Sequence, residues 1–142
     1  PVLVLGVGNR RVTADALGPR TVQKIFVTMG QRSVPVQGIR PVAAVAPGVS
    51  ASTGLSLQQL AAALVRQVRP AALLCVDSLC SSEPERLGRT LQFSDTGLFR
   101  DLVVTPRELD SVIAHGAALL AAAINRALQP RLSIAQLGWL TN

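Results

Sequence analysis

Two continuous apolar runs constrain the fold of this chain more than any other feature of its sequence. The runs are VLVLGV at residues 2–7 and AALLCV at residues 71–76, and neither alternates between apolar and polar positions. A strand with one face in water alternates, whereas a strand of a parallel sheet is covered on both faces and reads as an uninterrupted apolar run. The two runs therefore predict buried strands of a mainly parallel sheet.

Helical and extended patterns alternate along the rest of the chain. Apolar residues recur at helical spacing in residues 16–29, 55–70 and 105–128, and Pro19 falls in the first turn of the first of these helices. Shorter runs at residues 41–48 and 87–95 predict two further strands, the second at an edge of the sheet. This alternation predicts an α/β fold with three layers, α/β/α, built as a single domain over residues 1–142.

Composition and charge exclude several classes of function. Aromatic residues make up 3% of the 142 residues, so stacking platforms for single-stranded nucleic acid are not expected. The net charge of +6 comes mainly from scattered Arg residues without a basic run, which predicts no direct nucleic-acid partner, although an acidic partner would suit this surface. No apolar stretch is long enough to predict a membrane span, no signal peptide is recognised, and a cytoplasmic protein is expected. Cys75 lies in an apolar run and is expected in the core.

Three aspartates lie at or beyond the ends of expected strands, where sites form in open α/β sheets. Asp15 follows the first strand, Asp77 ends the AALLCVD run, and Asp95 follows LQFS. If the first and third strands are neighbours, Asp15 and Asp77 can approach each other and share one proton. One carboxylate would then take a proton from water while the other polarises a peptide carbonyl, which is aspartic-protease chemistry.

Simpler interpretations stand beside this one. Asp15 would serve equally as the N-cap of the following helix, and Asp77 could simply turn the chain at the end of its strand. The triplet Asp-Thr-Gly that begins at Asp95 also occurs in pepsin-like proteases, but a match of three residues is weak, so Asp95 is expected at the periphery of a site. His115 is the sole histidine and lies within a predicted helix, so no metal site and no cofactor are predicted.

Several long blocks follow one another along the chain: VLVLGVGNRRVTADALGP, IRPVAAVAPGVSASTG, AALLCVDSLCSSEPERLGRTLQFSDTG, LVVTPRELDSVI and AAAINRALQP. In this order they resemble the germination protease family, the atypical aspartic endopeptidases of bacterial endospores. The resemblance places the two catalytic aspartates on Asp15 and Asp77, the pair that the strand-end argument selects. Asn9, Arg10, Ser78 and Asp95 are expected to contact the substrate around them.

The resemblance also implies properties of the whole protein. It implies a fold similar to that of hydrogenase maturation proteases, a homotetramer, and a zymogen whose N-terminal propeptide is expected to be absent here. The implied substrates are small acid-soluble spore proteins, degraded during germination in the spore core or forespore.

The sequence departs from the family near residues 97–103, where a middle segment of the family is missing. If that segment was dropped from the sequence, neighbouring Cα atoms between residues 97 and 102 should lie farther apart than about 3.8 Å. The missing segment favours one alternative, a non-catalytic relative that binds a partner. A metal-dependent maturation-type protease on the same fold is a further alternative.

Overall fold

The computed structural model describes residues 1–30, 38–79, 83–86, 91–95 and 109–140. The strands in these ranges are β1 (Val2–Gly6), β2 (Val42–Val45) and β3 (Ala72–Val76). The α-helices are α1 (Leu17–Val22), α2 (Ser50–Thr53), α3 (Leu57–Val68), α4 (Leu109–Leu128) and α5 (Ile134–Leu140), and the short 3-10 helices are η1 (Thr13–Asp15) and η2 (Pro84–Arg86).

A three-stranded, all-parallel sheet forms the centre of the molecule, in the order β2-β1-β3. The register pairs Val2 with Val42 on one side and with Ala72 on the other. Every residue of β1 is buried, because neighbouring strands and covering helices leave no face of it in water. The predicted α/β class and the parallel sheet are confirmed, and the first and third strands are neighbours.

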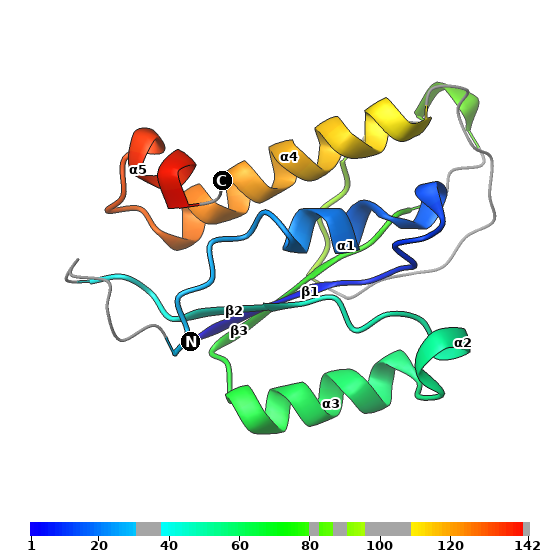
Figure 1. Ribbon diagram of the computed structural model, residues 1–142, viewed down its shortest axis with the longest axis horizontal. Helices are drawn as coiled ribbons and strands as arrows, with labels where there is room; N and C mark the ends of the chain where they lie inside the picture. Colours follow the sequence, from blue (N-terminus) through cyan, green and yellow to red (C-terminus); the bar gives the residue numbers. More distant parts are fainter. Residues whose placement is uncertain (31–37, 80–82, 87–90, 96–108, 141–142) are drawn as a thin grey trace.

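Helices cover the two faces of the sheet (Figure 1). The helices α1 and α4 lie on one side, and α3 lies on the other, below the strands in this view. The main apolar cluster joins β1 and β2 to α4 and to the segment after α1; its buried members are Val2, Val4, Ile25, Val42, Ala121 and Leu128. A smaller cluster of Phe26, Leu132 and Leu137 holds the C-terminal segment.

The first helix is shorter than its apolar spacing predicts. The pattern extends over residues 16–29, but α1 ends at Val22. The side chain of Asn125 explains the difference, since it accepts a hydrogen bond from the Phe26 N–H at 2.8 Å and donates one to the Lys24 carbonyl at 2.8 Å. This buried amide satisfies backbone groups that would otherwise continue the helix. Ile25 and Phe26 are therefore buried outside regular structure.

The apolar run of β3 predicts a buried strand, and this part of the prediction is wrong. Residues Ala72 to Cys75 are exposed and only Val76 is buried. Side chains of a strand project to the two faces of the sheet, and α3, the helix on one of these faces, buries none of its own residues, so this face of the edge strand β3 is loosely covered. Cys75, expected in the core, is also exposed.

The prediction for residues 87–95 is also corrected in its described part. Residues 91–95 are exposed and contain no strand, while residues 87–90 lie outside the described ranges. The expected cap at Thr105, Pro106 and Glu108 and the expected break near residues 97–103 lie outside these ranges as well.

The helix α4 is long and apolar enough to cross a membrane by length and composition, over Asp110–Leu128. One of its faces is packed inside the fold, however. Ile113, Ala117, Ala121 and Leu128 are buried at helical spacing, as in the core-facing side of a helix that covers a sheet. The helix therefore has a structural role in covering α1 and β1.

Candidate functional site

The carboxyl ends of β1 and β3 meet at the point where the chain changes sides of the sheet. The connection from β1 to β2 contains α1, and the connection from β2 to β3 contains α3 on the opposite face (Figure 1). In open parallel sheets, ligands bind in the crevice outside such a switch point, because the two connections diverge there. Asp15 follows β1 and Asp77 follows β3, so both predicted aspartates lie at this edge.

The Asp15 side chain holds the loop after β1 and does not cap α1. Its Oδ2 atom accepts a hydrogen bond from the backbone N–H of Asn9 at 2.7 Å. The N-cap of α1 is Ala16, whose side chain makes no capping hydrogen bond. The N-cap interpretation of Asp15 is therefore wrong, and the half-buried carboxyl group is turned toward the turn that leaves the strand.

Ser78 joins the two strand ends. Its hydroxyl oxygen accepts a hydrogen bond from the Leu17 N–H at 3.3 Å, although the two residues are far apart in the chain. The Ser78 N–H donates to Oδ1 of Asp77 at 2.8 Å. One residue therefore links the carboxylate after β3 to the helix that begins just beyond Asp15.

Two glycines allow the backbone to pack this closely. Gly8 has φ of +124°, and a Cβ atom there would lie 2.9 Å from Oδ1 of Asp15 and would also collide with the Asp15 carbonyl. A Cβ atom at Gly18, in the DALGP motif, would collide with the carbonyl oxygens of Val7 and Val76. The motif is thus explained by geometry, since only a residue without Cβ lets α1 lie against the ends of both strands.

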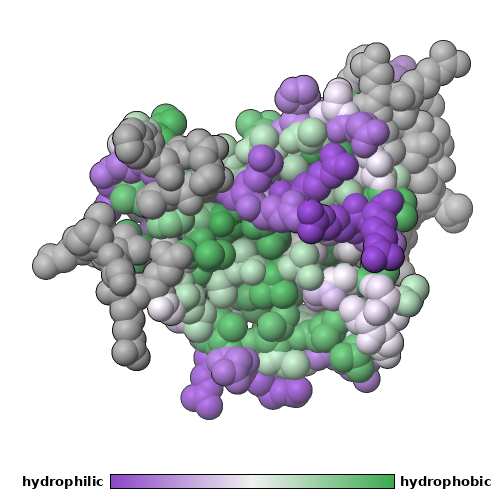
Figure 2. Space-filling model, in the orientation of Figure 1, coloured by the Kyte–Doolittle hydropathy of each residue, from purple (hydrophilic) through white to green (hydrophobic). Residues whose placement is uncertain are grey.

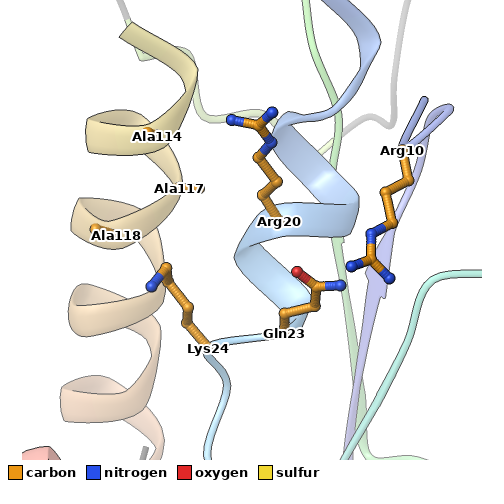
Figure 3. A pocket seen from close by; sticks show the side chains of 7 residues that line it. All are labelled: Arg10, Arg20, Gln23, Lys24, Ala114, Ala117 and Ala118. Carbon is orange, nitrogen blue, oxygen red and sulfur yellow. The ribbon is translucent and has the colours of Figure 1, made fainter. Parts of the chain in front are cut away.

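The remaining predicted site residues lie in different surroundings. The Asn9 Oδ1 atom accepts the Arg11 N–H at 3.0 Å, so this side chain stabilises the loop that carries Asp15. Arg10 extends from the same loop toward α1 and is exposed (Figure 3). Asp95 lies in an exposed bend, and among the described residues no hydrogen bond joins it to Asp15 or Asp77.

The Cys75 thiol is affected by the negative charge of Asp77 at the end of β3. Partial burial of the thiol raises the pKa of Cys75, and the Asp77 carboxylate, two residues along the same side of the strand, raises it further. Both causes disfavour the thiolate. Cys75 is accordingly expected to be a slow nucleophile at neutral pH.

Replacing Asp77 by Asn should accelerate alkylation of Cys75. Loss of the neighbouring negative charge lowers the pKa of the thiol and increases the thiolate fraction at pH 8, so the rate with iodoacetamide should rise by at least about twofold. The rate is measured in a Cys80→Ser background, because Cys80 is the second cysteine of the chain. Asp95→Asn is the matched control and should leave the rate unchanged; an unchanged rate in Asp77→Asn would contradict the assigned charge effect.

Metal ligands do not gather in the described part of the chain, where no group of three or more His, Cys, Asp or Glu side chains lies together. His115 is exposed on α4. The residues at the strand ends can therefore offer two carboxylates, a hydroxyl and backbone N–H groups to a ligand. The sequence did not reveal the linking role of Ser78 or the close packing at Gly18. The one signal for the latter is the Gly within DALGP, since glycine permits close approach of backbone segments.

Comparison with known proteins identifies a family for the segment that contains both strand ends. The model of the family described as germination protease matches residues 1–100, which include both strand ends. A germination protease of Clostridium perfringens (strain SM101) is 41% identical over 100 residues, covering 68% of this chain and 31% of that protein. The germination protease of Oceanobacillus iheyensis is 43% identical over 100 residues, covering 68% of this chain and 27% of that protein.

The match includes the DALGP and CVDS segments and ends before α4. The chain spans about a third of the length of these relatives. Since the family model covers more than half of the chain, the family assignment follows directly. This chain belongs to the germination protease family.

Proposed function

We propose that the chain is an endopeptidase, or the catalytic part of one, in which Asp15 and Asp77 activate a water molecule. The observation that supports this most strongly is topological. The two aspartates follow neighbouring parallel strands at the switch point of the sheet, and the Leu17 N–H to Ser78 hydroxyl bond of 3.3 Å ties the two strand ends together.

In the proposed reaction the two carboxyl groups carry one proton between them. The ionised carboxylate removes a proton from water, which attacks the peptide carbonyl, while the protonated carboxyl donates its proton to the carbonyl oxygen. The tetrahedral diol then collapses and the C–N bond breaks. The leaving amine takes a proton from the carboxyl group that received it from water, and a hydroxyl of the diol returns its proton to the other carboxylate, which leaves a neutral carboxylic acid product. The pair returns to its starting charge, and these steps need only the two carboxyl groups and water.

Substrate, assembly and location follow from the family resemblance and are proposals for this chain. The substrates would be small acid-soluble spore proteins, cleaved during germination in the cytoplasm of the spore. The enzyme would be a homo-oligomer, a tetramer by analogy, derived from an inactive precursor. A fold related to hydrogenase maturation proteases stays a prediction.

A second candidate function is supported by the sheet. Leu73 and Leu74 are exposed on β3, which is an edge strand among the described residues. A relative that binds spore protein without cleaving it would use this strand. The open edge would then offer backbone groups to an extended peptide.

Incubation of the purified chain with a small acid-soluble spore protein separates the candidates. Mass spectrometry should find discrete fragments whose amounts do not change when a chelator is added. Fragments that disappear with the chelator would favour metal-dependent cleavage. Intact substrate that co-elutes with the chain on gel filtration would contradict the endopeptidase and support the binding protein.

A further inference from the structure

A second polar feature is a groove that runs over α1 at its contact with α4 (Figure 3). Its volume is about 410 Å³, which lies within the range of small-molecule sites. The lining residues are Arg10, Arg20, Gln23, Lys24, Ala114, Ala117 and Ala118. In the space-filling view, hydrophilic side chains gather in a band over α1, above the apolar area of the sheet (Figure 2).

The spacing of the polar residues explains why they share one surface. Arg20, Gln23 and Lys24 are three and four positions apart, which places them on the same side of a helical segment. The hydrogen bond from the Lys24 N–H to the Thr21 carbonyl, 2.9 Å long, continues the helical turn beyond the end of α1. Arg20 and Lys24 extend toward the alanines of α4 (Figure 3).

Positive charge in the groove is only partly balanced. Three of the described lining side chains are cationic, and none of them is acidic. The acid that pairs with the groove is Asp110, whose Oδ1 atom lies 3.7 Å from Nη2 of Arg20 and whose side chain is 81% exposed. The same oxygen accepts a hydrogen bond from the Thr13 hydroxyl at 3.1 Å, so Asp110 is shared with the loop after β1. Among the described residues, the groove keeps a net positive charge that a bound anion would neutralise.

Gln23 orients Arg10, the third cationic side chain of the groove. Its amide oxygen, when turned toward Arg10, accepts hydrogen bonds from Nη1 at 3.0 Å and from Nη2 at 3.2 Å. The hydrogen-bond network favours this orientation over the one drawn in Figure 3, in which the amide nitrogen faces the guanidinium group. Arg10 is thereby held at the side of the groove nearest β1, opposite the alanines of α4 (Figure 3).

We propose that this groove binds a phosphate group, either free or as part of a small phosphate ester. A phosphate carries close to two negative charges at neutral pH and presents several acceptor oxygens, which suits two guanidinium groups and an ammonium group better than a single carboxylate does. The three alanines form an apolar wall without hydrogen-bonding side chains. An ester with a small apolar body would place that body against the alanines and its phosphate between Arg20 and Lys24.

Calorimetric titration of the chain with inorganic phosphate, pyrophosphate and phenyl phosphate tests the site and identifies the source of the phosphate. At pH 7.5 and an ionic strength of about 20 mM, at least one ligand should bind with a Kd between roughly 10 µM and 1 mM. Tighter binding of phenyl phosphate would identify an organic ester as the ligand, since only the ester can use the alanine wall. Equal or tighter binding of the inorganic ligands would identify free phosphate or pyrophosphate.

Two pairs of variants locate the binding. Lys24→Gln should weaken binding by about tenfold, whereas Arg66→Gln, an equal change of charge on α3, should leave it within about twofold. Ala118→Glu should abolish binding by adding a negative charge at the wall, whereas Ala122→Glu, one turn further along α4 at an exposed position outside the lining, should not. Melting curves establish that each variant folds.

Two results would overturn the proposal. One is the absence of binding by all three ligands up to about 10 mM, a concentration at which even weak sites fill. The other is that the groove variants and their control variants weaken phosphate binding by the same factor. Neither result depends on proteolysis, so this inference and the proposed endopeptidase can fail independently.

Discussion

Asp15→Asn and Asp77→Asn should each reduce cleavage of a small acid-soluble spore protein by at least about a thousandfold, the upper part of the range for general acid–base catalysis. An amide has nearly the same shape as a carboxyl group but can neither accept a proton from water nor donate one at neutral pH. The loss should therefore appear in kcat, with KM nearly unchanged, because the backbone and Ser78 remain in place.

The folding of these variants should be close to that of the parent chain. In Asp15→Asn the new amide still offers an oxygen to the Asn9 N–H, so the 2.7 Å hydrogen bond can be kept in a neutral form. The chemical role of Asp15 is thus separable from its role in holding the loop. Melting temperature and circular dichroism measure the second role, and quantified fragments measure the first.

Glu85→Gln is the matched control, since it removes one exposed negative charge in η2, outside the strand ends. It should cleave within about twofold of the parent rate. If both aspartate variants retained most of their activity while folding normally, the paired carboxylates would not be the catalytic groups. If only one lost activity, the two acids would not act as a proton-sharing pair.

Elements whose determinants are local could be predicted from the sequence, and α3 shows why. Ser56 and Gln59 form a capping box, with the Gln59 N–H donating to Ser56 at 3.2 Å and the Ser56 N–H donating to Gln59 at 2.9 Å. Both partners lie within one turn, so four consecutive residues determine the start of the helix. The position of Asp15 and Asp77 after two strands could be predicted in the same way, because each aspartate follows an apolar run.

Elements that depend on distant contacts could not be predicted in the same way. The end of α1 is determined by Asn125, which lies about a hundred residues further along the chain. The apolar run of β3 shows that the strand is suited to burial, but not how many strands stand beside it. The N-cap interpretation of Asp15 failed because a local rule was applied where the Asn9 N–H competes for the carboxylate.

The groove between α1 and α4 belongs to this second class. The spacing of Arg20 and Lys24 on one helical surface was visible in the sequence. What the spacing did not show was that the alanines of α4 would face them. A cluster of charges becomes a binding site only when tertiary packing supplies the opposite wall, so the site could be found only in the structure.

Gly18→Ala is expected to destabilise the fold strongly, by about 4 kcal/mol. The new Cβ atom would collide with the backbone carbonyl oxygens of Val7 and Val76, which cannot move without breaking the sheet. The Val76 carbonyl already accepts the Val7 N–H at 2.8 Å, so any shift that relieves the collision also strains the pairing of β1 with β3. The expected fall in melting temperature is at least about 10 °C.

Gly116→Ala separates this collision from the general effect of adding a methyl group to a helical glycine. In α4 the nearest atom to a new Cβ would be Cδ1 of Leu17 at 3.4 Å, the end of a flexible side chain. Because Ala favours the helix over Gly by about 1 kcal/mol, this control should be neutral or stabilising. A Gly18→Ala variant as stable as the parent would mean that α1 is not pressed against both strand ends, and the proposed meeting of Asp15 and Asp77 would lose its structural basis. A variant that is destabilised as expected, and whose remaining folded fraction also cleaves slowly, would instead show that the close packing at Gly18 positions the two acids.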